Sequence, residues 1–317
     1  MQTTIDIINQ VLPILLLISL GIWMRRKNFI AEKTVQELQK LVVNFALPAV
    51  LFLSFLTLEL KPSYLLIFGV ILVLVILLFL LGQFLLKQFD LPYAYFPYLV
   101  TGFEYGMIGI SLFGAAYGLE KIGYLAVIDL GQEVFIWFIF MPLLLIKRDG
   151  AQNPQAIVKA FISSPVVLSI IFSLGFNFLG VAELLTRLPV TGALLTTFDF
   201  LGKLTVPLIL ISVGYGIRID RSKLGAAMQV VLVRLGLLIP LALVLNKTLI
   251  RGYLGLEPFF EKALFTLLVL PPPFILPLYL PDDLAQDERE YINNVLTIHS
   301  VVSIVVFLLY FALTPIG

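Results

Sequence analysis

The chain carries three consecutive prolines, Pro271, Pro272 and Pro273, and then Pro277, inside an apolar stretch that runs from Ala263 to Leu280. That stretch is long enough to cross a lipid bilayer. Each proline lacks its N–H, and its ring clashes with the carbonyl four residues back, so the stretch cannot form a continuous helix. In hydrocarbon an unpaired carbonyl is costly, so a break of this kind survives only where protein buries it or where it lines a cavity. The sequence therefore predicts a broken membrane helix.

Composition places the rest of the chain in a membrane as well. Of the 317 residues, 60% are hydrophobic and 13% are charged. The mean hydropathy is +1.04, a value that soluble globular domains do not reach. The formal net charge is +1 and no long basic or acidic tract occurs, so nothing indicates a nucleic acid partner. The absence of cysteine excludes disulfides and thiolate chemistry. We expect a polytopic membrane protein in contact with membrane lipids.

Ten apolar runs have roughly the 17 to 25 residues that a membrane span needs. They lie near residues 7–24, 38–58, 63–86, 93–116, 122–146, 156–180, 194–217, 224–249, 259–280 and 291–314. Loops after the odd-numbered spans are the richer in Lys and Arg, as in the loop with Arg218, Arg221 and Lys223. The positive-inside rule then puts both termini outside the cytoplasm. We expect an integral protein of the plasma (inner) membrane.

The polar segment 147–155 divides five spans from five, and the two halves look alike. Span two has Pro48 followed by an apolar run and then charged residues, and span seven repeats this pattern after Pro207. Because each half has an odd number of spans, a repeat has to be inverted in the membrane. Spans four and nine are the Gly- or Pro-interrupted spans at matching places, which points to a binding site near the bilayer midplane. We predict two repeats, 1–149 and 150–317, within one integral membrane unit.

Two runs resemble signatures of a known family. They are LVVNFALPAVLF at residues 41–52 and LTVPLILISVG at residues 204–214. Both are similar to matching segments of the auxin efflux carrier family, which includes plant PIN-type carriers and bacterial malate and malonate permease-like proteins. The family is related to the bile acid:sodium symporter superfamily. The resemblance extends over the whole chain in length, span number and the short central loop.

The resemblance implies an all-α polytopic membrane protein with ten transmembrane helices in a five-plus-five inverted repeat. It implies scaffold and transport subdomains drawn from both halves, with broken fourth and ninth helices that cross near the substrate. The implied activity is secondary transport of an organic anion by alternating access, with H⁺ or Na⁺ as a possible coupling ion and no other cofactor. Dimers are common in the family, so a homodimer stands beside the monomer as an alternative.

Span four departs from the family pattern. The family often has Asn-Thr-Gly-x-x-Gly-x-Pro, whereas this chain has EYGMIGIS from Glu104 to Ser111. Glu104 therefore stands at the position of the crossover Asn. An amide can donate a hydrogen bond to an anionic substrate, whereas an ionised carboxylate repels it. Glu104 is a candidate for proton coupling, and the structural alternative is a carboxylate satisfied by Lys203.

Charged residues inside spans cost about 2.5 to 3.5 kcal/mol each on insertion scales, which makes them candidates for function. Asp199 and Lys203 lie four residues apart on span seven with the acidic residue first, the order that an i,i+4 ion pair prefers. Lys203 also corresponds to Asn44 in the repeat and lies one turn before Pro207, so we expect it beside the crossover. A purely structural pair is the alternative.

Asp129 and Glu133 lie four residues apart on span five, a spacing at which like charges repel. We expect either a cationic side chain or a bound H⁺ or Na⁺ between them. Arg234 on span eight is the candidate side chain, and a static Arg–carboxylate bridge is the structural alternative to a coupling ion. These three residues and Asp199 form the predicted membrane charge network.

We place substrate or ion binding at the two breaks and at their repeat partners. The predicted residues are Asn44, Glu104, Tyr105, Gly106, Lys203, Pro271, Pro272 and Pro273. Carbonyls freed by the prolines would hold a cation or substrate donors, and half-helix N-termini would present their positive dipole ends to anionic groups. No residue is assigned to catalysis or to a metal.

A secondary transporter of a small organic solute is the leading functional interpretation, and the resemblance favours an organic acid. An ion channel is the second class, but channels normally assemble selectivity residues from several subunits. A membrane enzyme is disfavoured, because the sequence has neither a His-Glu-x-x-His nor a Gly-x-Ser-x-Gly motif. A membrane sensor or receptor is the remaining alternative.

Overall fold

The computed structural model of the protein describes residues 4–58, 61–149, 155, 159, 162–217, 224–281 and 283–314. Over these residues the chain is helical and contains no strand, which confirms the predicted all-α class. The basic loop with Arg218, Arg221 and Lys223, used above for orientation, lies outside the described residues. The predicted boundary between the two repeats, at residues 149 and 150, falls where the described residues 61–149 end.

The helical elements follow one another along the whole described chain. They are α1 (Thr4–Arg26), α2 (Glu32–Leu41), η1 (Val42–Ala46), α3 (Leu47–Leu56), α4 (Tyr64–Gln88), α5 (Phe96–Val100), η2 (Tyr105–Gly109), α6 (Ile110–Tyr117), η3 (Leu119–Lys121), α7 (Ile122–Phe135), η4 (Ile136–Phe140), α8 (Met141–Asp149), α10 (Pro165–Phe178), α11 (Ala182–Arg187), α12 (Pro189–Lys203), α13 (Thr205–Gly216), α14 (Leu224–Leu245), η5 (Asn246–Tyr253), α15 (Pro258–Val269), η6 (Leu276–Tyr279) and α16 (Gln286–Leu313). Several adjacent elements join into single long helices.

Within the described residues, seven helical stretches are long and apolar enough to cross a membrane. They are Glu32–Leu56, Tyr64–Gln88, Phe96–Tyr117, Leu119–Arg148, Pro189–Gly216, Leu224–Tyr253 and Gln286–Leu313. Each coincides with a predicted span. Predicted span one corresponds to the 23-residue α1 and span six to the 14-residue α10. Span nine corresponds to the 12-residue α15 and the non-helical segment that follows Val269. The count of ten membrane crossings stays a prediction.

Two of the prolines inside the spans coincide with loosened helical turns. Pro48 and Pro142 lack the N–H that would bond a carbonyl one turn earlier. A wide π-helical turn precedes each of them, at Val42–Ala46 and at Ile136–Phe140. Such turns let a helix absorb a missing hydrogen bond. In span seven the chain likewise passes from α12 to α13 at Leu204, just before Pro207.

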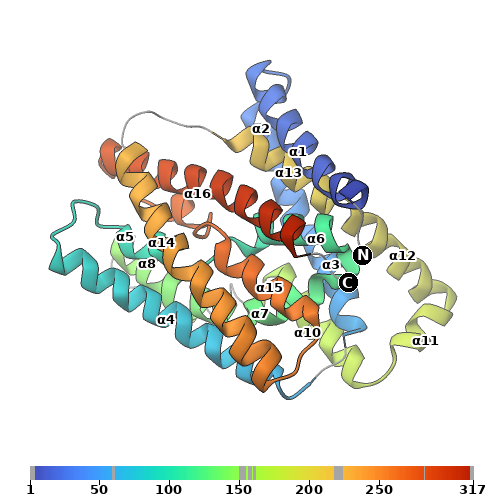
Figure 1. Cartoon of the computed structure of the whole chain (residues 1–317). Coiled ribbons are helices and arrows are strands. Elements are labelled where there is room, and N and C mark those ends of the chain that lie inside the picture. Colours follow the sequence, from blue (N-terminus) through green and yellow to red (C-terminus); the bar gives the residue numbers. More distant parts are fainter. Residues whose placement is uncertain are drawn as a thin grey trace.

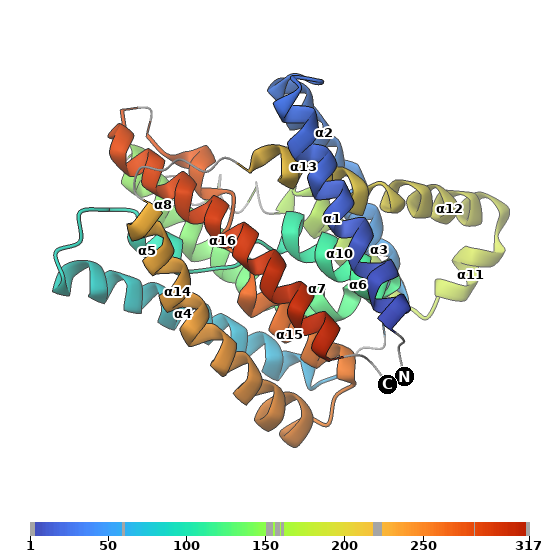
Figure 2. The ribbon, with the colours of Figure 1, turned by 45° about the horizontal axis from the view of Figure 1, so that its top comes forward.

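The helices form two groups (Figures 1 and 2). One contains α1, α2, α3, α10, α12 and α13, and the other contains α4, α5, α7, α14, α15 and α16, with α6 between them. The pairings correspond between the two halves of the chain, because α1 packs on α13 as α10 packs on α3, and α4 packs on α7 as α14 packs on α16. This correspondence supports an inverted repeat, which itself remains a prediction.

Two glycines bring α1 and α13 together backbone to backbone. A Cβ placed on Gly21 would lie 2.0 Å from the carbonyl oxygen of Ile211, and one placed on Gly214 would lie 2.0 Å from that of Ile18. No side chain larger than hydrogen fits at either position. Small residues allow this close approach in membranes, where packing drives helix association. The pair α1–α13 is therefore a tightly packed part of the first helix group.

We expect Gly214→Ala to destabilise the protein by about 1 to 3 kcal/mol, because the added methyl group forces α1 away from α13. The matched control is Gly236→Ala in α14, where a Cβ would meet nothing within 4 Å. Replacing an exposed helical glycine by alanine is expected to be neutral or to stabilise by up to about 1 kcal/mol. Thermal unfolding in detergent compares the two, and equal effects would contradict the close contact.

Candidate functional site

The two interrupted spans meet at the centre of the protein. The first leaves helical geometry after α5, continues as non-helical chain through residues 101–104 and becomes helical again at Tyr105. The second ends its helix at Val269, as the prolines require. The N–H of Glu104 donates to the carbonyl oxygen of Pro271 at 2.8 Å, which joins the two segments directly. The predicted break in each span is confirmed, and the two breaks are in contact.

Gly102 makes this contact sterically possible. Its φ is +72°, a left-handed conformation that side chains disfavour. A Cβ placed there would lie 2.8 Å from Cγ of Pro273. The proline ring therefore lies against the face of the glycine. A glycine in one break and a proline in the other are complementary shapes.

The carboxylate of Glu104 ties the same two segments together a second time. Its Oε1 accepts the N–H of Met107 at 3.1 Å, and its Oε2 accepts the N–H of Phe274 at 2.6 Å. The side chain is 9% exposed. Hydrogen bonds from backbone N–H groups to a carboxylate are among the stronger ones in proteins. Glu104 is thus both the N-cap of the helix that follows and a bridge to the proline segment.

Arg234 of α14 covers the carbonyl oxygens that the breaks leave without helical partners. Its Nη1 donates to Leu99 at 3.0 Å, and its Nη2 donates to Gly102 and, at 3.3 Å, to Leu270. The guanidinium also lies 5.0 Å from the ring centroid of Phe103, a cation–π distance. The residue is 3% exposed. The predicted bridge from Arg234 to Asp129 or Glu133 is therefore replaced by bonds to backbone carbonyls, and none of the ion pairs between described residues includes Arg234.

A second polar cluster lies behind the crossover on α7. Gln132 donates from Nε2 both to the carbonyl oxygen of Phe103 and to Oδ1 of Asp129, each at 2.8 Å. Trp137 donates to Oε2 of Glu133 at 3.1 Å. Oδ2 of Asp129, Oε1 of Gln132 and the hydroxyl of Tyr105 are buried without a hydrogen-bond partner among the described residues. These two oxygens of Asp129 and Gln132 are therefore acceptors that the described residues leave without a donor.

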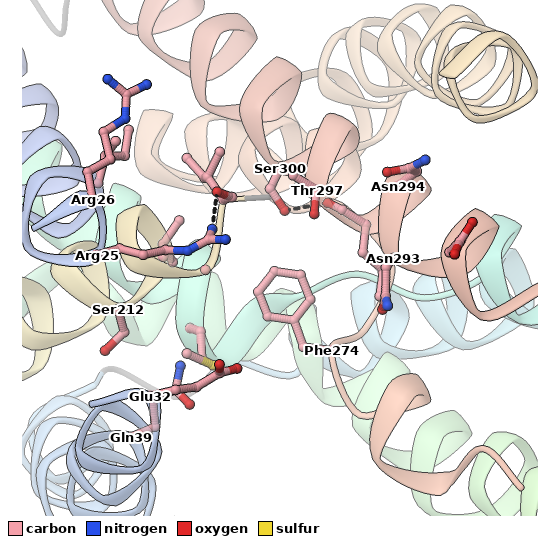
Figure 3. A pocket seen from close by; sticks show the side chains of 17 residues that line it. Arg25, Arg26, Glu32, Gln39, Ser212, Phe274, Asn293, Asn294, Thr297 and Ser300 are labelled. Atoms are coloured by element: carbon pink, nitrogen blue, oxygen red, sulfur yellow. Dashed lines mark hydrogen bonds between the residues drawn. The ribbon is translucent and has the colours of Figure 1, made fainter. Parts of the chain in front are cut away.

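A cavity of about 1240 Å³ opens beside the crossover, between α1, α2 and α13 on one side and α16 on the other. Figure 3 shows Phe274 between Asn293 and Asn294 on one wall and Arg25 and Ser212 on the opposite wall. Met107 also lines the cavity. Both backbone donors to Glu104 therefore belong to residues of the cavity wall. A volume of this size is large enough for a small organic molecule.

The structure brings most of the predicted binding residues together, but not all of them. Glu104, Tyr105, Gly106 and the prolines 271–273 lie at the crossover. Asn44 is exposed, and its side-chain amide donates to the carbonyl of Lys40 at 2.8 Å. Lys203 lies elsewhere, and neither Lys203 nor Asn44 lines the cavity.

Lys203 instead forms the predicted ion pair with Asp199. Its Nζ lies 2.6 Å from Oδ2 of Asp199, and the side chains of Lys203 and Asp199 are 62% and 49% exposed. The ion pair is confirmed. The expectation that Lys203 lies beside the crossover is wrong, and so is the structural alternative in which Lys203 satisfies Glu104. The i,i+4 spacing fixed the partner but not the direction in which this helix face points.

The interpretation of the sequence did not identify the polar residues of α16 that line the cavity. Asn293, Thr297 and Ser300 follow one another at helical spacing along a span that is otherwise apolar. Residues three or four apart lie on one helix face. A polar stripe inside a membrane helix could have indicated a lined cavity. Arg25 had no such signal, because it reads as an ordinary basic residue at a span end.

An all-helical membrane fold with a broken-helix crossover and a polar internal cavity is the architecture of a membrane transporter. A family model described as membrane transport protein matches residues 6–311. The chain therefore belongs to the membrane transport protein family, in agreement with its resemblance to the auxin efflux carriers. A search of curated proteins gave no match.

We expect Arg234→Leu to destabilise the fold by roughly 3 kcal/mol or more, because it leaves buried carbonyl oxygens at both breaks without donors. The apparent melting temperature in detergent should fall by about 6 °C or more. Arg187→Leu is the control, since Arg187 pairs with Glu183 where their side chains are 78% and 85% exposed. Equal melting temperatures for the two variants would contradict the role given to Arg234.

Proposed function

We propose that the protein is a permease that carries a small organic solute across the membrane by alternating access. The observation that carries this proposal is the placement of the cavity, whose wall includes residues of both broken segments. In such carriers the substrate binds near the midplane, where broken helices expose backbone groups. One helix group then moves against the other around the bound solute. The family resemblance favours an organic acid, which is an anion. The negative carboxylate of Glu104 instead favours a solute that carries a positive charge.

The cavity lies where the two helix groups face one another, which suits this mechanism. Ser212 and Gln39 contribute from the first group, and Thr297 and Ser300 contribute from the second. A solute bound there would contact both groups, and movement of one group would change its access to each side of the membrane. Proton or sodium coupling is part of the proposal, and the acceptor oxygens around Asp129 are the place for it.

Filling the cavity is expected to stop transport without unfolding the protein. Thr297→Trp should lower saturable uptake and counterflow in proteoliposomes by about tenfold or more, because the indole takes the space of the solute. The control is Leu309→Trp on the same helix, where the side chain is 57% exposed. Solutes that give saturable counterflow with the unmodified protein serve as the assay. Full activity of Thr297→Trp, with matched membrane levels, would place the solute elsewhere.

The proposed orientation has both termini outside the cytoplasm of a plasma (inner) membrane. Because the chain has no cysteine, single cysteines report the side of each loop cleanly. We expect Leu179→Cys, at the end of predicted span six and just after α10, to react with an impermeant maleimide in intact cells. Lys33→Cys, after span one, should react only after permeabilisation. The reverse pattern would invert the topology.

A further inference from the structure

We propose that the carboxylate of Glu104 takes up, at the crossover, the backbone N–H groups that would otherwise bind an anionic solute. The cavity then takes a solute with a cationic amine or a neutral amide group, and not an organic anion. This inference rests on the proposed function, because it names the substrate class of the same cavity. It is carried by the two N–H groups that Glu104 accepts, one from each broken segment.

Backbone donors are scarce on the proline segment. Residues 271–273 have no N–H, and the N–H of Leu270 is used by the carbonyl of Leu267 at 3.1 Å. Phe274 therefore carries the first N–H after the break that is left for an anion. That N–H goes to Oε2 of Glu104 at 2.6 Å. The N–H group nearest the break in this segment is therefore already bonded to a side chain of the protein.

A backbone N–H of the other broken segment is also bonded to Glu104. Met107 lies in the first turn after the break, where backbone N–H groups point away from the helix and attract anions. Its N–H goes to Oε1 of Glu104 at 3.1 Å. These are the groups that a substrate carboxylate would need if half-helix ends were to bind it. An anionic solute would find them occupied and would face a like charge.

No charged side chain of the described residues forms an ion pair with Glu104. The lining includes two arginines, Arg25 and Arg26, and two glutamates, Glu32 and Glu290, whose formal charges cancel. Arg234 directs its donors to backbone carbonyls.

Glu104 does not itself line the cavity, but Met107 and Phe274, whose N–H groups hold its carboxylate, do. A cationic group of a solute bound against these two residues would lie next to that charge, and an amide N–H would bring a donor without charge.

Arg25 is the competing position for an anion. Its Nη1 donates to the carbonyl oxygen of Ile217 at 2.7 Å, just beyond the end of α13. A cation is favoured at the C-terminal end of a helix, where carbonyl oxygens converge. This bond gives Arg25 a structural role at the end of α13. Binding of an anion at Arg25 is therefore an outcome that the experiment has to detect.

The test compares solutes of one shape and three charges in proteoliposomes. The first series is putrescine, succinamide and succinate, and the second is tryptamine, indole-3-acetamide and indole-3-acetate, each corrected for leak into protein-free vesicles. We expect saturable uptake or counterflow of an amine or amide member and none of the acids. Saturable uptake of an acid would overturn the inference while leaving the permease function intact. No saturable transport of any member would count against both.

Variants at two positions then locate the selectivity. Glu104→Gln should lower uptake of the amine by about tenfold or more relative to the amide, because it removes the charge that pairs with the amine. Arg25→Gln should leave the ratio between amine and amide unchanged. An unchanged ratio in Glu104→Gln would overturn the inference. If Glu104→Gln does not fold, the selectivity of the unmodified protein among the six solutes decides alone.

Discussion

The lipid interior offers no water to an unpaired peptide group, and this constraint organises the centre of the protein. At both breaks, side chains from other helices donate to several of the carbonyl oxygens. The hydroxyl of Ser303 donates to the carbonyl of Val269 at 2.5 Å, Gln132 donates to Phe103, and Arg234 serves carbonyls on both breaks. The helices α7, α14 and α16 each carry one of these donors. These three helices surround the crossover and supply hydrogen-bond donors to its carbonyl oxygens.

The sequence predicts the features that depend on covalent structure or on short-range spacing. A run of three prolines ends a helix in any surroundings, so the break after Val269 was predictable. The same holds for the ion pair of Asp199 with Lys203, because four residues bring two side chains to one helix face. The position of Glu104 within the first break followed from the glycines around it. All three are local properties that need no knowledge of neighbouring helices.

What the sequence could not predict depends on how each helix is rotated about its axis. Asn44 and Lys203 occupy matching places before Pro48 and Pro207, yet both point to the surface of the first helix group. The partners of Arg234 were missed for a related reason, because a charged residue in a span was matched with other charges and not with carbonyl oxygens. Carbonyls become available only when the breaks are folded. The inverted repeat has matching helix pairings in its favour, and a count of ten crossings is still to be tested.

The three prolines have a further mechanical consequence. A glycine-rich break can wind into helix and unwind again, whereas residues 271–273 have fixed φ angles and no N–H with which to extend a helix. The segment therefore cannot act as a gate by local coiling. The segment is stiff, and hydrogen bonds join it to Glu104 and, through Arg234, to α14. In the proposed transport cycle, a change of access would therefore come from movement of whole helices and not from refolding of this segment.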